Sequence, residues 1–315
     1  KNVTIRSIIV KDLPSNFKDY LLSDGIQLPL YATKVSSFMN SNNNDDDESW
    51  SSSLSDTNNN NNEDDESQDD DESPTFSFPE LNEQIRSSIR ALGCDVVPKL
   101  NWSCPKDAVW INNGTMKCTT PGDIYLLLKS SDFCLHDIQQ YETIQQEESQ
   151  NVKLELVLRK WCNFYRSMEF RCFVKDNELI AISQRNYTQY YSHLIEDMPR
   201  IREEIDEFFE DTIQHRFTNL TNYVVDLYMD KQHRLWIIDF NIWDKSTDSL
   251  LYTWSELLNV EEVDVPDYRI VQTDNEVRQD PLSSYRAPID TVNLVSGGGN
   301  GDFSLQFEEF MKQCH

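Results

Sequence analysis

The sequence predicts an α+β fold with antiparallel sheets, and three observations support this prediction. Short apolar runs with the length of strands occur in both halves of the chain. Several of these runs are separated by turns of only a few residues, which is typical of hairpins. Segments with an apolar residue at every third or fourth position lie between them and predict amphipathic helices. This mixed order differs from the strand–helix alternation of a doubly wound parallel sheet.

Before residue 150, three apolar runs predict short strands: residues 3–10, 96–100 and 108–111. Three segments predict helices: residues 17–21, residues 81–92, and a segment that begins at Thr120-Pro121. Gly93 ends the second helix, because glycine readily adopts the left-handed conformation found just after a helix. Thr120 is a good N-cap, and Pro121 fits the first helical turn.

After residue 150, five runs predict strands: residues 154–161, 169–174, 179–184, 223–229 and 235–241. Asp176-Asn177 joins the second run to the third, and residues 230–234 join the last two, so both pairs are predicted hairpins. Residues 194–213 predict a long helix with apolar side chains on one face and acidic side chains elsewhere.

Acidic residues are unevenly distributed along the chain. The 315 residues carry a net charge of −27, and thirteen acidic residues but no Lys or Arg fall between Asn40 and Pro79. Residues 36–77 are rich in Asn, Ser and Asp and have no periodic apolar face, so they predict a disordered acidic insertion. A solvated linker is the simpler interpretation of this insertion, and an acidic docking arm is the alternative.

Composition also excludes several classes of function. A chain this acidic is not expected to bind nucleic acid directly, because phosphate contacts require clustered Lys and Arg. No apolar run reaches the about 20 residues that a membrane-spanning helix needs. The seven cysteines include no Cys-x-x-Cys pair, which favours reduced thiols in a cytoplasmic protein. P-loop, Rossmann and protein-kinase signatures do not occur.

The last predicted hairpin carries a candidate metal site. Asp239 and Asn241 are two residues apart in one strand and therefore project from the same face. Asp226 lies on the partner strand, roughly opposite them. Such oxygen ligands suit magnesium, which completes its shell with phosphates and water. A strand end and a turn cap explain the spacing equally well, but a carboxylate inside an apolar strand needs a cation or several donors nearby.

Cationic side chains on the predicted strands are candidate phosphate ligands: Arg159, Lys160, Arg171 and Arg185. An arginine in an apolar strand is unfavourable unless it faces an anion, and its planar fork suits phosphate or carboxylate. For any single arginine, a buried pair with Glu155 or Glu169 is the simpler interpretation. Convergence of several with the candidate metal ligands favours a triphosphate. Lys99, at the end of a short strand, carries little weight by itself.

Longer strings of residues resemble a known family. They include Pro98-Lys99-Leu100-Asn101-Trp102-Ser103, Glu169-Phe170-Arg171-Cys172-Phe173-Val174, Ile238-Asp239-Phe240-Asn241 and Thr247-Asp248-Ser249-Leu250-Leu251-Tyr252-Thr253-Trp254. These strings resemble the cell division cycle 123 family, the assembly chaperones of eukaryotic translation initiation factor two. The resemblance covers most of the chain outside the insertion. Cys104 and Lys106 depart from the pattern, which has a small residue and an arginine there.

The resemblance implies an ATP-grasp fold, in which two α+β lobes with antiparallel sheets and packed helices hold ATP and magnesium between them. It places Lys99, Trp102 and Ser103 on the lobe that covers the phosphates. Arg159, Lys160 and Trp161 are implied to lie on the hinge beside adenine and ribose. Arg171 and Arg185 are implied to touch phosphates, and the implied magnesium ligands, also part of the nucleotide site, are Asp226, Asp239 and Asn241.

The implied organisation has four parts. Residues 1–35 are the N-terminal part of the ATP-grasp domain, and residues 36–77 are the insertion. The core is residues 78–263, with a smaller lobe at 94–153 and a metal-bearing lobe at 154–263. Residues 264–315 form a C-terminal tail rich in Pro, Asp and Gly. Its amphipathic residues 303–311 are either a docking helix for a partner or a helix that folds back on its own domain.

By the same resemblance, the protein binds the gamma subunit of translation initiation factor two and promotes assembly of the heterotrimer. It thereby supports translation initiation and cell-cycle progression. A monomer without membrane or nucleic-acid contact is expected before the partner binds, and no catalytic residue is predicted. The alternative is an ATP-grasp ligase that activates a carboxylate as an acylphosphate. That alternative requires an acceptor pocket, which no motif in the sequence marks.

Overall fold

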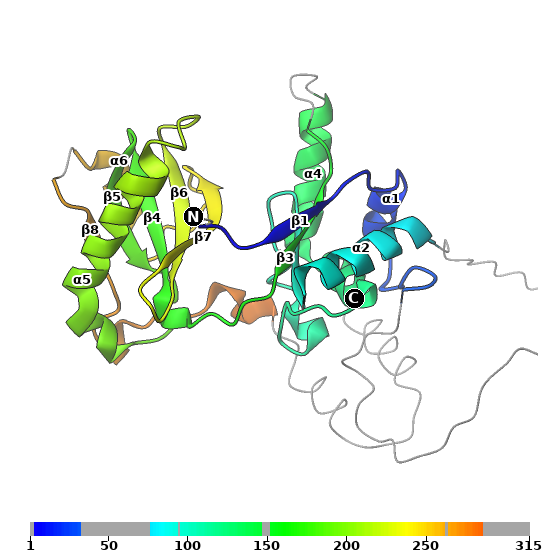
Figure 1. Cartoon of the computed structure of the whole chain (residues 1–315), viewed down its shortest axis with the longest axis horizontal. Coiled ribbons are helices and arrows are strands. Elements are labelled where there is room, and N and C mark those ends of the chain that lie inside the picture. The colour runs from blue at the N-terminus through cyan, green and yellow to red at the C-terminus, as the bar shows by residue number, and fades with distance from the viewer. Residues whose placement is uncertain (1–2, 33–75, 94, 147–151, 262–263, 286–315) are drawn as a thin grey trace, which may run out of the picture.

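The computed structural model of the chain contains two sheets, and helices pack against each of them (Figure 1). The structure describes residues 3–32, 76–93, 95–146, 152–261 and 264–285. Most of the predicted insertion and the amphipathic residues 303–311 lie outside these ranges. The predicted α+β class is confirmed, because all strand pairs but one within the two sheets are antiparallel.

The smaller sheet has three strands in the order β1-β3-β2. They are β1 (Ser7–Val10), β2 (Val96–Leu100) and β3 (Leu156–Lys160). Four helices accompany it: α1 (Phe17–Leu22), α2 (Pro79–Leu92), α3 (Pro121–Lys129) and α4 (Asp132–Gln146). One apolar core unites these helices with one face of the sheet. We call this part, residues 7–22 and 76–160, the small lobe.

The larger sheet has the order β7-β6-β4-β5-β8. Its strands are β4 (Glu169–Lys175), β5 (Glu178–Gln184), β6 (Tyr223–Met229), β7 (Leu235–Ile242) and β8 (Asp267–Arg269). Helix α5 (Ser192–Phe208) and the π-helical turn η3 (Phe209–Gln214) pack on one face, and α6 (Trp254–Asn259) packs on part of the other. The 3₁₀ turn η2 (Arg166–Met168) precedes β4, and two further 3₁₀ turns follow β8: η4 (Asp274–Glu276) and η5 (Pro281–Tyr285). We call residues 166–271 the large lobe.

Local signals place the helix ends where the sequence predicts them. Gly93 follows α2 with φ +75°, the left-handed region that favours glycine. Thr120 accepts a hydrogen bond from the Asp123 amide, and the Asp123 carboxylate accepts one from the Thr120 amide, so α3 begins with a capping box. The Asp176-Asn177 turn has positive φ at both residues, as a tight hairpin requires.

Two predictions of secondary structure are wrong or incomplete. Residues 108–111 are not a strand, since a 3₁₀ helix, η1 (Val109–Asn112), occupies that position. The backbone reverses there, because Asn113 is left-handed and the Gly114 amide donates to Val109 O at 2.8 Å. Four apolar residues do not distinguish a strand from a helical turn. Helices α4 and α6 and strand β8 were not predicted.

The predicted lobe and tail boundaries also need correction. Strand β3 belongs to the small sheet, so the change of lobe falls after Lys160 and not at residue 154. The carbonyl of Phe76 accepts from Leu30 N at 2.8 Å, so Phe76 and Ser77 belong to the small lobe and not to the insertion. Residues 264–285 are not a loose tail, because β8 pairs with β5 and Tyr268 is buried.

Segments from both ends of the described chain connect the lobes. Near the N-terminus, Val3 O accepts from Ile237 N of β7 at 2.8 Å, and Arg6 O accepts from Lys160 N of β3 at 2.9 Å. Figure 1 shows this segment running from β7 into β1. Near the other end, the ring of Tyr285 meets that of Phe133 at 5.9 Å. No helix among the described residues has the length and apolarity to cross a bilayer.

Candidate functional site

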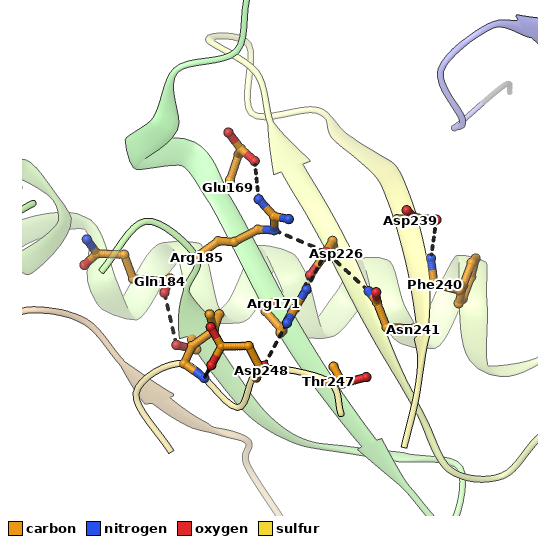
Figure 2. A network of polar contacts seen from close by, with 12 residues as sticks. Glu169, Arg171, Gln184, Arg185, Asp226, Asp239, Phe240, Asn241, Thr247 and Asp248 are labelled. Carbon is orange, nitrogen blue, oxygen red and sulfur yellow. Dashed lines mark hydrogen bonds and ion pairs between the residues drawn. The ribbon is translucent and has the colours of Figure 1, made fainter. Parts of the chain in front are cut away.

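Strand register brings four polar residues to one face of the large sheet. Arg171 on β4 lies opposite Ser183 on β5 and opposite Asp226 on β6. Asp226 in turn lies opposite Asp239 on β7. Residues directly opposite in antiparallel strands project from the same face, so these four side chains form one row across the sheet. Figure 2 shows Arg171, Asp226 and Asp239 of this row. The predicted opposition of the two carboxylates is therefore found.

Asp226 is the centre of a buried charge network and is 2% exposed. Arg171 Nε and Nη2 donate to its two carboxylate oxygens at 2.8 and 2.9 Å. Arg185 Nε forms an ion pair with it at 3.1 Å, and Arg185 Nη1 donates to Glu169 at 3.1 Å. Asn241 Nδ2 completes the network at 3.4 Å from Asp226. The interpretation of Arg185 as a partner of Glu169 thus holds together with its contact to Asp226.

The arginines determine the charge state of Asp226. Burial alone would raise the pKa of this carboxyl group, but Arg171 and Arg185 outweigh burial and hold its pKa well below the usual range. Asp226 in turn raises the pKa of Arg185, against the opposing effect of burial. Asp226 is therefore ionised at neutral pH.

A β-bulge lies beside Asp239. Asp226 pairs with Asp239, whereas the next residue, Leu227, pairs with Ile237, so Ile238 is the extra residue of β7. A bulge twists the strand locally and changes the direction of neighbouring side chains, which is common next to binding sites. The side chain of Asp239 is 26% exposed, so it is less enclosed than that of Asp226.

Lys99 and Asp239 connect the two lobes directly. Lys99 Nζ on β2 lies 2.6 Å from both carboxylate oxygens of Asp239 on β7. The lysine side chain is only 11% exposed. The predicted phosphate ligand of one lobe and the predicted metal ligand of the other therefore contact each other, although 140 residues separate them in the sequence.

Strand alternation separates the three predicted hinge residues. Arg159 lies opposite Val97, and Val97 alternates with Lys99 on one face of β2, so Arg159 and Lys99 share a face. Lys160 lies opposite Val96 and projects from the other face. Trp161 follows the strand, and its amide donates to Asp95 O at 2.8 Å.

A cavity of about 500 Å³ lies between the lobes. Residues 4–8, Leu92 and Arg159 line it on one side, and residues 237–240 line it on the other. Its walls combine apolar side chains with the charged groups of Arg159 and Asp239. Of the three predicted hinge residues, Arg159 is the one that lines this cavity.

The loop after β2 is held by a residue that the sequence analysis missed. Asp137 on α4 accepts from the amides of Trp102 and Ser103 at 3.1 and 2.7 Å, and from Ser103 Oγ at 2.8 Å. These donors point into the small lobe, so Ser103 is not placed to bind a phosphate in this conformation. The Trp102 side chain remains 46% exposed. An acidic residue on an unpredicted helix gave no signal in the sequence.

Lys106 and Asp248 also belong to the surroundings of the site. Arg185, and after it burial, lowers the pKa of Lys106 to about 8, so this lysine lies within the field of the arginine pair. Arg171 Nη1 donates to the main-chain oxygen of Asp248 at 2.7 Å. Figure 2 shows the loop of Thr247 and Asp248 beside Arg171. All three nitrogens of the Arg171 guanidinium therefore donate a hydrogen bond.

The residues present fit a magnesium ion that arrives with phosphate oxygens. Asp239 and Asn241 project from the same face of β7, and Asp226 lies opposite Asp239 on β6. All three side chains carry the hard oxygen atoms that magnesium prefers. Within the described ranges, no three His, Cys, Asp or Glu side chains are arranged to hold a metal ion by themselves. Magnesium completes its shell with phosphate oxygens and water, so a bound polyphosphate would supply the remaining oxygens.

The fold and the site define a class: a two-lobed α+β protein with a charged site between its lobes. A family model described as D123 matches residues 1–295, and the chain belongs to this family. It is 42% identical to a "Translation initiation factor eIF2 assembly protein" of Xenopus tropicalis, over 94% of this chain and 88% of that protein. It is 40% identical to "Cell division cycle protein 123" of Phaeosphaeria nodorum, over the same shares.

A solved structure agrees with this assignment. Cdc123 from Schizosaccharomyces pombe matches with a TM-score of 0.64 and 31% sequence identity, over 86% of this chain and 91% of that chain. The resemblance to the cell division cycle 123 family is therefore confirmed.

Proposed function

We propose that this protein binds magnesium-ATP between its lobes and acts as an assembly chaperone for translation initiation factor two. The observation that carries the nucleotide part is the cross-lobe site, where Lys99 and two arginines surround Asp226 and Asp239. This combination of cations and hard oxygen donors matches a triphosphate with its metal. The proposed arrangement is that of an ATP-grasp protein.

Each residue of the site has a proposed task. Arg171 and Arg185 hold Asp226 in place and would also contact a phosphate bound beside it. Asp239 and Asn241 would hold the magnesium ion with Asp226, and the ion would neutralise phosphate charge. Lys99 and Arg159 share the face of the small sheet that is turned toward the large lobe and would contact the nucleotide from there. Contact of the nucleotide with the other predicted residues stays a prediction; these are Lys160, Trp161, Trp102 and Ser103.

The chaperone part rests on the relatives, several of which bear the name of an assembly protein for eIF2. We infer that this chain assists assembly of the same factor and contacts its gamma subunit. The gamma subunit is expected to contact residues 286–315 together with an adjacent lobe face. Pull-down of the gamma subunit by the full chain and by a chain ending at Tyr285 tests this contact. Equal recovery of the gamma subunit would contradict a role for those residues.

Substitution of the metal ligands tests the nucleotide site. Asp239→Ala and Asn241→Ala are expected to weaken magnesium-ATP binding by about 1.5–3 kcal/mol, the usual effect of losing a contact with a charged group. Calorimetric titration measures the affinity. Glu203→Ala, an exposed acid on α5, is the matched control and should leave it unchanged. Unchanged affinity in both site variants would remove these residues from the proposal, and an acylphosphate product would favour the ligase alternative.

A further inference from the structure

The carboxylates of the candidate magnesium site already accept contacts from cationic side chains. Lys99 Nζ lies 2.6 Å from both oxygens of Asp239. Arg171 donates to both oxygens of Asp226 at 2.8 and 2.9 Å, and Arg185 adds an ion pair at 3.1 Å. A metal ion that approaches alone must therefore displace protein cations, and these cations gain no other anion in exchange.

We propose that Lys99 is a latch on Asp239 that admits the metal only together with a polyphosphate. This inference rests on the proposed nucleotide-binding function and specifies the form in which the nucleotide binds. The ligand is the metal–nucleotide complex, and neither component binds well by itself. Lys99 is the element of the latch because Asp239 is the more exposed of the two carboxylates and the lysine contacts both of its oxygens.

The contacts explain why each component alone is disfavoured. If a metal takes Asp239, the ammonium group of Lys99, on a side chain that is only 11% exposed, loses its partner. An enclosed charge without a partner is strongly unfavourable. If a nucleotide without metal takes Lys99, Asp239 loses its cationic partner and faces the phosphate, and two anionic groups side by side repel each other. Both losses disappear when the two components arrive together.

The exchange leaves no charge without a partner. Lys99 moves from a carboxylate to a phosphate oxygen, and Asp239 moves from an ammonium group to the metal. Because Lys99 is on β2 and Asp239 is on β7, the same exchange removes a direct ion pair between the lobes. The hydrogen bond from Ile237 N to Val3 O at 2.8 Å does not involve either charge and can persist. Loading of the site is thus coupled to the contact between the lobes.

Manganese binding without nucleotide tests the latch. Electron paramagnetic resonance measures the free ion while Mn²⁺ is titrated into the wild-type chain and into Lys99→Met. The substitution frees Asp239 from its cation, so Mn²⁺ alone should bind about tenfold or more tightly than to the wild type. This gain has the opposite sign to the loss expected from structural damage. Lys99→Gln, titrated in parallel, gives the same test if the methionine variant does not fold.

Two controls separate the latch from a general loss of positive charge. Lys117→Met breaks another Lys–Asp ion pair of 2.6 Å, with Asp95, and should leave Mn²⁺ binding unchanged. The double variant Lys99→Met with Asp239→Asn should lose the gain, because the freed carboxylate is gone. A gain in the Lys117 variant would assign the effect to net charge. Persistence of the gain in the double variant, whose net charge equals that of the wild type, would show that Asp239 is not the carboxylate that binds the ion.

The result that overturns the latch is distinct from the one that overturns the proposed function. Wild-type protein that binds Mn²⁺ alone as tightly as Lys99→Met does would show that Lys99 does not exclude the metal. Separate calorimetric titrations with magnesium-ATP and with ATP plus chelator then test the ligand itself. Absence of magnesium-ATP binding to the wild type would contradict the nucleotide function. Equal affinity for ATP with and without metal would contradict the proposal that metal and nucleotide must bind together.

Discussion

At the scale of single residues, the site is organised by ionic pairing around Asp226. The carboxylate is 2% exposed and accepts from two nitrogens of Arg171. Arg185 connects it to Glu169, so two arginines and two carboxylates balance one another. Removing one member of such a buried group is more damaging than removing all of it, because charges are left without partners.

The Asp226→Asn variant makes this dependence measurable as a function of pH. It is expected to lower the free energy of unfolding at pH 7 by about 3–5 kcal/mol. Because the folded-state pKa of Asp226 is depressed, its ionised form stabilises the fold above its unfolded pKa of about 3.9. That stabilisation is lost as the pH falls through the depressed folded-state pKa. The difference between wild type and variant should therefore shrink in acid.

Urea unfolding at pH 7, 5 and 3 checks this expectation. The exposed Asp211→Asn, on η3, is the control and should show a small effect throughout. A difference for Asp226→Asn that stays constant from neutral pH to acid would contradict the role of its charge.

At the scale of elements, β8 shows that the segment after residue 264 belongs to the fold. Its three residues pair with β5 in parallel, with Tyr268 opposite Ile182. Ile270 and Val271 follow it, and all three apolar side chains are buried. Val271 N also donates to Gln184 Oε1 at 3.0 Å. Strand β8 thereby covers the edge of β5, the strand that directly precedes Arg185.

Truncation separates the role of β8 from that of the chain beyond it. A chain ending at Pro266 loses the three buried side chains, each of which contributes about 1.5–3 kcal/mol when buried. Its melting temperature should fall by several degrees or more, and amide exchange in β5 should accelerate. A chain ending at Tyr285 keeps β8 and should retain both properties. Equal melting temperatures for the two truncated chains would show that β8 does not stabilise the sheet.

At the scale of the whole molecule, contacts of three kinds join the two lobes. Lys99–Asp239 joins them directly, whereas Val3–Ile237 and Phe133–Tyr285 join each lobe to a segment that flanks the other. The described part of the small lobe is interrupted between residues 32 and 76. Phe76 meets Tyr20 with ring centroids 5.4 Å apart, so the end of the insertion is anchored in the core of the small lobe.

Two deletions therefore should differ, although only three residues distinguish them. Removal of residues 36–74 with a short linker should change the melting temperature by a few degrees at most, since these residues lack a periodic apolar face. Removal of residues 36–77 also deletes the partly buried Phe76 and should destabilise the chain further, by less than the about 3–5 kcal/mol typical of a fully buried aromatic residue. Differential scanning calorimetry compares both with the full chain. A large effect of the shorter deletion would show that the insertion itself stabilises the fold.

The sequence by itself determined most of the local structure. Apolar periodicity and turn residues identified most strands and helices, although not α4, α6 or β8, because these signals act over a few residues. The hairpin of β6 and β7 even placed Asp226 opposite Asp239, since strand pairing follows from the turn. The four apolar residues at 108–111 were misread because so short a run fits either a strand or a helical turn.

Only the tertiary structure decided which charges meet. Lys99 and Asp239 are 140 residues apart, and Arg171 and Asp226 are 55 apart, so no local period relates them. Asp137 holds Ser103 from a helix that carried no recognisable signal. Such contacts depend on how the two sheets pack against their helices and against each other. Burial then fixes their strength, because ion pairing is much stronger where water is excluded.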